Sequence, residues 1–237
     1  MFNKVSLSIL VLSLTICTSV SCIKKDPLMR ISQVLFAPLS PDAPAVDFSL
    51  NNQIVATTVN YSATVGTATF NFPYFTTMPG SNSIKFNLTG STSTSIASGS
   101  IEMAEDKAYS SFLIDSFKRA KIVFVNDNLD EPTPGKVKIR FFHFSANAPA
   151  VDVTLGATGP ILFANRSFND QEGNEAKQSF IEIDPGTYTF VFKLTGTNTA
   201  AYTTSALNLL PDRIYTLAAR GFVGGATNRA LGAWFCE

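Results

Sequence analysis

Few residues of this chain could take part in chemistry. His143 is the only histidine among the 237 residues, and it stands between Phe142 and Phe144 in an apparent strand. A catalytic histidine needs an activated nucleophile and an orienting acid, and no nucleophile motif such as G-x-S-x-G is present. We therefore interpret His143 as a structural residue, with ligand contact as the alternative reading.

A group of acidic residues, Asp170, Glu172 and Glu175, falls in the polar segment 169–177. Two carboxylates catalyse glycoside hydrolysis when they face each other across a cleft. Three acids in one loop are more often simply solvated. We interpret them as a surface loop, and a hydrolase that uses Glu172 and His143 is the weakest of our functional hypotheses.

A second polar segment, 126–135, has the composition of a calcium-binding loop. An EF-hand needs Asp first, Gly sixth and Glu twelfth, whereas the sequence has Asn126, Glu131 and Val137 there. The segment is therefore interpreted as a linker, with a looser cation site as the alternative. The sequence has no P-loop, dinucleotide-binding glycine fingerprint or Cys/His cluster. We predict no catalytic residue, no metal ligand and no cofactor, and expect that the protein is not an enzyme.

Aromatic residues are the remaining candidates for ligand contact. Alternation along a strand places Phe70, Phe72 and Tyr74 on one face, expected to be the core, and Phe75 on the other. Core packing is the simpler interpretation, and a sugar-stacking platform is the alternative. The same two readings apply to Trp234, so Phe75, His143 and Trp234 are the candidate ligand contacts.

The sequence pattern is that of an all-β protein. Charged residues are 15% of the chain, against roughly 25% in average soluble chains. Apolar and polar residues alternate with a period of two, which places apolar side chains on one face of each strand. No segment has a sustained helical period. We expect strands in the first part of the chain near residues 30–37, 45–50, 54–59, 68–75, 82–88, 95–102, 107–115 and 120–126.

The chain contains an internal repeat. Residues 40–50 read SPDAPAVDFSL and residues 145–155 read SANAPAVDVTL, and seven of these eleven positions are identical. Two further matched blocks follow in the same order at nearly the same offset. Units of this size suit a β-sandwich, so we predict two tandem, immunoglobulin-like β-sandwich domains. The expected boundaries are a signal peptide at 1–21, a tether at 22–28, repeat one at 29–126, a linker at 127–135 and repeat two at 136–237.

The repeated motif has a structural interpretation. Its proline fixes φ in a turn that enters a strand, and its valine is expected to point into the core. Its aspartate then points the opposite way, where a carboxylate near a strand start can accept hydrogen bonds from loop amides. These residue pairs are Pro44 and Pro149, Val46 and Val151, and Asp47 and Asp152.

The motif also carries a family resemblance. Ala-Pro-Ala-Val-Asp occurs at 43–47 and 148–152, and the second copy follows Arg-Phe-Phe-His-Phe-Ser at 140–145. In these residues the chain resembles the DUF4397 family of envelope proteins, once per repeat and over nearly all of the mature chain. A two-domain lipoprotein of this kind is similar to those of Bacteroidetes. The resemblance implies a fold and a location but no activity.

The first residues form an export signal. Lys4 precedes an apolar run at 5–18, which is short for a membrane span. Ser19-Val20-Ser21-Cys22 resembles a bacterial lipobox, in which the cysteine is acylated and becomes the new N-terminus. We therefore predict lipidation at Cys22 and anchoring to a membrane through acyl chains. Because Ile23 rather than aspartate follows Cys22, the expected location is the outer membrane, periplasmic or surface-facing.

These patterns lead to a functional hypothesis. The formal net charge is zero, so no basic surface directs the chain to nucleic acid. We predict a lipid-anchored, non-catalytic binding or adhesion module of the cell envelope. The alternative is a structural or accessory subunit of an envelope assembly. The expected partners are the membrane, through the lipid, and either a glycan or an envelope protein.

Overall fold

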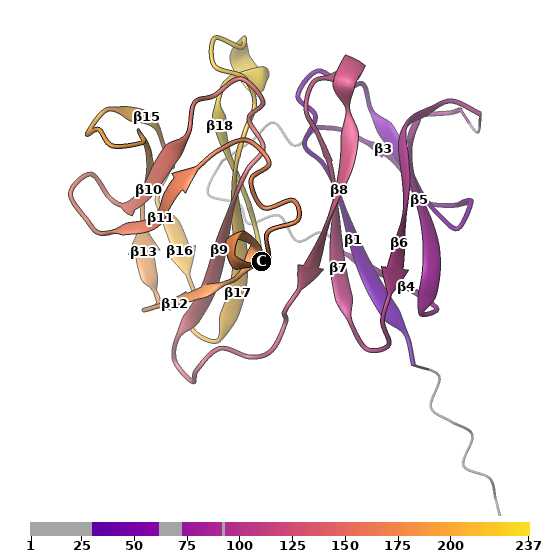
Figure 1. Cartoon of the computed structure of the whole chain (residues 1–237), viewed down its shortest axis with the longest axis horizontal. Coiled ribbons are helices and arrows are strands. Elements are labelled where there is room, and N and C mark those ends of the chain that lie inside the picture. Colours follow the sequence, from indigo (N-terminus) through magenta and orange to yellow (C-terminus); the bar gives the residue numbers. More distant parts are fainter. Residues whose placement is uncertain (1–29, 62–72, 92) are drawn as a thin grey trace, which may run out of the picture.

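The structure is a computed structural model that describes residues 30–61, 73–91 and 93–237. As expected, the described residues are nearly all β (Figure 1). We call the part up to Asp127 the first half and the part from Val137 onward the second half. The first half contains β1 (Ser32–Pro38), β2 (Val46–Leu50), β3 (Gln53–Val59), β4 (Tyr74–Thr77), β5 (Gly80–Leu88), β6 (Ser95–Met103), β7 (Ala108–Ile114) and β8 (Lys121–Asp127).

The second half is also built mainly of strands. They are β9 (Val137–His143), β10 (Val151–Leu155), β11 (Ile161–Arg166), β12 (Ile181–Ile183), β13 (Gly186–Tyr188), β14 (Phe190–Leu194), β15 (Ala200–Thr203), β16 (Leu207–Leu209), β17 (Arg213–Arg220) and β18 (Gly232–Cys236). The described helical segments are short: α1 (Glu175–Gln178) and the 3-10 turns η1 (Phe117–Arg119) and η2 (Thr227–Arg229). None of the described helices has the length and hydropathy needed to cross a membrane.

The sheet order repeats between the two halves. The first half has the sheets β4-β1-β7-β8 and β3-β2-β5-β6. The second half has β12-β9-β17-β18 and β11-β10-β14-β15, together with the small sheet β13-β16. In each half one pair of central strands is parallel, β1 with β7 and β9 with β17. The immunoglobulin-like description and the exact domain boundaries stay predictions.

Three buried apolar clusters separate four layers of sheet. One lies between the two sheets of the first half and one between the sheets of the second half. The third, which we call the seam, joins sheet β4-β1-β7-β8 to sheet β12-β9-β17-β18. The residues of all three clusters lie between Val34 and Cys236 in the sequence. The seam consists of Leu35, Ala37, Leu39, Phe112, Ile114, Val123, Val125, Phe142, Phe144, Ala218, Trp234 and Cys236.

The seam corrects the expectation that each strand is apolar on one face only. Along β1, Val34 and Phe36 face the core of the first half, whereas Leu35 and Ala37 face the seam. Strands β7 and β18 are likewise buried along their whole length, and β9 is buried at every position except Lys138. A sheet covered on both sides needs apolar residues at successive positions. The expectation was wrong because each inner sheet packs against the outer sheet of its own half on one face and against the inner sheet of the other half on the other face.

The aromatic cluster of the first half is oriented differently from the prediction. Phe75 packs into the core of the first half, with its ring 5.6 Å from the ring of Phe36. Tyr74 lies on the other face, against the seam. The alternation is correct but the assignment of faces is reversed, because both faces of this sheet are covered. Phe70 and Phe72 lie outside the described residues.

The repeated motif forms the same contacts in both halves. Asp47 accepts hydrogen bonds from the backbone N–H groups of Thr58 (2.7 Å) and Gly90 (3.0 Å). Asp152 accepts the equivalent bonds from Asn165 (2.7 Å) and Gly196 (3.0 Å). Each carboxylate thus fastens the end of the neighbouring strand, β3 or β11, and one turn to the start of β2 or β10. Both motif valines are buried and both motif prolines lie in exposed turns: Val46, Val151, Pro44 and Pro149.

Candidate functional site

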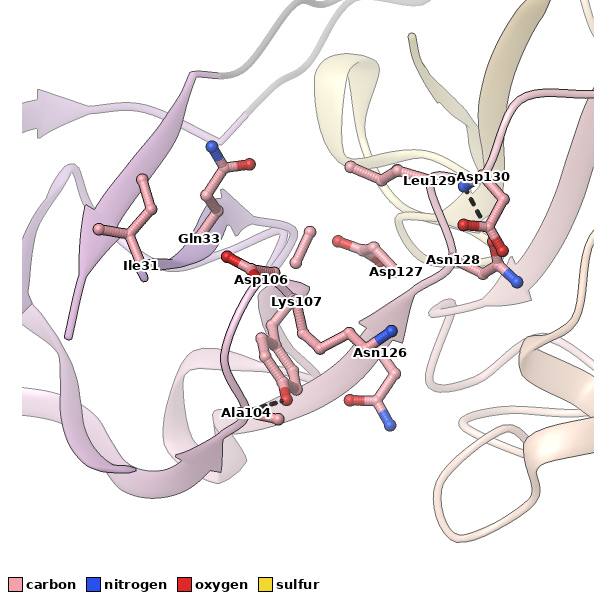
Figure 2. A pocket seen from close by; sticks show the side chains of 12 residues that line it. Ile31, Gln33, Ala104, Asp106, Lys107, Asn126, Asp127, Asn128, Leu129 and Asp130 are labelled. Atoms are coloured by element: carbon pink, nitrogen blue, oxygen red, sulfur yellow. Dashed lines mark hydrogen bonds between the residues drawn. The ribbon is translucent and has the colours of Figure 1, made fainter. Parts of the chain in front are cut away.

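A pocket of about 710 Å³ opens at the end of the molecule where β1 begins. Its wall combines the start of β1, the turn between β6 and β7, the end of β8 and the segment that leads to the second half (Figure 2). Two exposed apolar side chains contribute to it, Ile31 and Leu129. The pocket is therefore open, mixed in polarity and bounded by segments far apart in sequence.

Five polar side chains at this pocket form no hydrogen bond or ion pair within the described residues. They are Gln33, Asp106, Lys107, Asn126 and Asp130, and Figure 2 shows them around the same opening. The set combines two carboxylates, an ammonium group and two amides, so it offers both donors and acceptors to a ligand.

The turn that carries two of these side chains is firmly held. The N–H of Asp106 donates to the Ile31 carbonyl at 3.0 Å, and the N–H of Gln33 donates to the Lys107 carbonyl at 3.0 Å. The Tyr109 hydroxyl accepts the N–H of Ala104 at 2.9 Å, on the inner side of the turn. The pocket wall is therefore fixed before any ligand arrives, which lowers the entropy cost of binding.

The second half has the same turn without the free carboxylate. The Tyr215 hydroxyl accepts the N–H of Leu210 at 3.1 Å, as its counterpart does in the first half. However, the Asp212 carboxylate accepts the N–H of Gly135 at 2.7 Å. The segment between the halves thus satisfies Asp212, whereas the equivalent Asp106 is left open to solvent.

A buried ion pair lies beside the pocket and joins the two halves. Asp127, at the end of β8, contacts Arg140 of β9 with an Oδ1–Nη2 distance of 2.6 Å, and both side chains are almost fully buried. The other carboxylate oxygen accepts hydrogen bonds from Tyr74 (2.8 Å) and Ser110 (2.7 Å). Burial, and then the charge of Asp127, raise the pKa of Tyr74, so its hydroxyl stays protonated and donates.

The guanidinium of Arg140 is satisfied on all sides. Its Nε donates to the Thr216 hydroxyl at 2.9 Å, and its Nη1 donates to the Asn126 carbonyl at 3.3 Å. The rings of Phe142 and Phe180 lie 4.8 Å and 4.5 Å from its central carbon. Buried charges are tolerated when they are paired and hydrogen-bonded in this way. This network is built to hold the halves together rather than to react.

A family model described as "Domain of unknown function (DUF4397)" matches residues 32–154, which is more than half of the chain. The chain belongs to the DUF4397 family. The match runs from β1 into β10. The lipoprotein nature, the Bacteroidetes origin and a second family copy stay predictions. No functionally curated protein matches the sequence.

Solved structures resemble this DUF4397 chain only weakly. The Bacillus anthracis TIE protein is 10% identical over 81% of this chain, with a TM-score of 0.24, and the chain spans 34% of its length. A candidate cell adhesion protein from Bacteroides fragilis NCTC 9343 is 8% identical over 86% of this chain and 97% of its own, with a TM-score of 0.23. These likenesses are too weak to assign a function.

The three residues predicted as candidate ligand contacts are buried or half-buried. Trp234 is buried in the seam, 5.8 Å from Phe112 between ring centres, and Phe75 is half-buried in the first half. His143 is fully buried, and its Nε2 donates to the Pro149 carbonyl at 3.2 Å. Ligand contact at these three residues stays a prediction. Cys22, the predicted lipidation site, lies outside the described residues.

The acidic loop of the second half is more ordered than a solvated loop. The Asp170 carboxylate contacts Arg166 (3.0 Å) and Lys177 (2.6 Å) and is largely buried. Burial opposes its charge, but the hydrogen bonds from these two cations outweigh it and lower the pKa of Asp170. Glu172 pairs with Lys121 of the first half. In the described part of the chain, His, Cys, Asp and Glu side chains form no group of three that could hold a metal.

The buried ion pair yields a first prediction. Arg140→Met leaves Asp127 charged and unpaired in a dry environment, so the free energy of unfolding should fall by about 3–5 kcal/mol. Arg140→Met combined with Asp127→Asn should cost less than the sum of the two single changes, measured by denaturant unfolding. Lys136→Met is the control, because it breaks an exposed pair with Asp184 and should leave stability almost unchanged. If the losses of stability in the two single variants simply add up in the double variant, Asp127 and Arg140 are not directly coupled.

The buried histidine yields a pH prediction. Burial lowers the pKa of His143 below its ordinary value of 6.5. Above that pH both folded and unfolded chains hold a neutral imidazole. Below it the unfolded chain binds a proton that the folded chain resists, so stability should fall as the pH falls from 6.5. Between pH 7.5 and pH 5, the free energy of unfolding of His143→Gln should fall less than that of the parent chain, measured by denaturant unfolding at each pH. An equal loss in both proteins would contradict this.

Proposed function

We propose that this protein is a lipid-anchored, non-catalytic module of the cell envelope that binds a glycan in the pocket of Figure 2. The observation that carries the proposal is the set of five polar side chains without a partner among the described residues, on a rigid, open pocket wall. By contrast, the buried charges of Asp127 and Arg140 beside the pocket are satisfied by the protein itself. Polar groups held in place without a partner are suited to a ligand that supplies one.

A glycan fits the chemistry of this pocket. Sugar hydroxyl groups both donate and accept hydrogen bonds, which suits the amides of Gln33 and Asn126 and the charged groups of Asp106 and Lys107. Sugar rings also present apolar C–H faces, and the exposed side chains of Ile31 and Leu129 border the same pocket. The mixture of charges would disfavour a strongly anionic or strongly cationic ligand.

The anchor and the pocket are compatible in position. Eight peptide units separate Cys22 from Arg30, and an extended chain advances at most about 3.5 Å per residue. A lipid on Cys22 would therefore keep β1, and the pocket at its start, within roughly 30 Å of the membrane. At that distance the module would meet glycans that belong to the envelope itself.

Binding to a glycan array tests the pocket. Gln33→Ala combined with Asp106→Ala should lower the affinity for the bound glycan at least about tenfold, because two hydrogen-bonding groups are lost. Glu131→Ala is the control, because it removes an exposed carboxylate from the nearby segment and should leave affinity unchanged. Equal affinity in the double variant and the parent would exclude this pocket.

Cell fractionation tests the anchor. The parent chain should be found in the membrane fraction and should label with a fatty-acid analogue. Cys22→Ser removes the acyl acceptor, so the label should be lost. Protease treatment of intact cells then distinguishes a surface-facing from a periplasmic protein. Labelling that survives Cys22→Ser would refute the anchor while leaving the glycan site open to its own test.

A further inference from the structure

Two loops form the end of the molecule opposite the pocket. They connect β7 to β8, at 115–120, and β17 to β18, at 221–231. Figure 1 shows both at the upper end, whereas β1 begins at the lower end. In the first half this follows from pairing, because β7 runs parallel to β1 and its loop leaves at the far end of β1.

The repeated motif holds both loops in the same way. Asp42 accepts the N–H of Phe117 at 2.7 Å. Asn147, at the matching position of the second copy, accepts the N–H of Val223 at 2.8 Å and donates to its carbonyl at 3.0 Å. Each loop therefore presents an apolar side chain to solvent on a fixed backbone. Phe117 is 42% exposed and Val223 is 48% exposed.

The exposed charges beside these side chains are positive. Lys118 and Arg229 are exposed, and neither forms an ion pair within the described residues. Arg119 is 69% exposed although it contacts Asp115, whose own side chain is only 12% exposed. The solvent-exposed charged side chains of these two loops are therefore basic.

The pocket end has the opposite balance, since acidic residues outnumber basic ones in its turns. The acids there are Glu105, Asp106, Asp130, Glu131, Asp184, Asp212 and Glu237, and the bases are Arg30, Lys107, Lys136 and Arg213. A chain with no net charge is thus polarised along its length, which orients it in the field of a charged surface.

We propose that the two loops dock onto an anionic lipid bilayer. The loops stand at the upper end of the molecule in Figure 1 and carry side chains that project into solvent, so we take a partner that accepts projecting side chains. The acyl boundary of a bilayer accepts Phe117 and Val223, and anionic headgroups attract the adjoining cations. The acidic end is repelled by the same surface, so the molecule stands with its loops inserted.

Vesicle sedimentation tests this surface separately from the anchor and the glycan site. The protein is residues 22–237 made without lipid, which keeps every described strand and all three cores. Partition into vesicles of phosphatidylcholine with phosphatidylglycerol should exceed partition into phosphatidylcholine alone at least about tenfold, and should fall with added salt.

Matched variants locate the contact. Phe117→Ser combined with Val223→Ser should lower partition at least about tenfold, since both side chains are exposed and their backbone contacts remain. Ile161→Ser combined with Leu210→Ser removes two similarly exposed apolar side chains outside these two loops and should change nothing. Equal partition of the loop variant and the parent would overturn the proposal. Absence of partition, or retention only on an acidic polysaccharide, would also overturn it.

Discussion

The buried ion pair between Asp127 and Arg140 is the constraint on which the arrangement of the two halves depends. Its members come from β8 and β9, and Tyr74 and Thr216 complete the network from β4 and β17. Two charges are costly to bury unless geometry and hydrogen bonds are nearly complete. The network is complete only when the inner sheets meet in one register, so it specifies that register while the apolar seam supplies most of the attraction.

The fixed seam determines where binding surfaces can lie. Because the inner sheets are covered on both sides, only the two ends and the outer sheets remain available to partners. At one end the segment between the halves satisfies Asp212 but leaves its counterpart Asp106 open, and a pocket results. At the other end the repeated motif fixes two loops through Asp42 and Asn147. The two ends of the molecule thereby differ.

Much of this fold could be predicted from the sequence, and the candidate site could not. Period-two patterns and turn residues located seven strands of the first half to within about two residues, because both signals are local. The predicted strand 68–75 overlaps β4 only at Tyr74 and Phe75, and residues 68–72 lie outside the described part of the chain. The reversed faces of Tyr74 and Phe75 could not be predicted, since they depend on a second sheet supplied by the other half. The pocket was missed for a similar reason. Asp106 and Asp212 occupy matching positions, and only tertiary structure shows which carboxylate is satisfied.

Differential scanning calorimetry of residues 22–237 tests most directly whether the seam makes the two halves one body. If the buried ion pair and the seam couple the halves, unfolding should be a single transition whose calorimetric enthalpy equals its van't Hoff enthalpy. Arg140→Met should lower the temperature of that transition and begin to separate it into two. Two independent transitions in the parent chain, with the calorimetric enthalpy well above the van't Hoff enthalpy, would contradict the account.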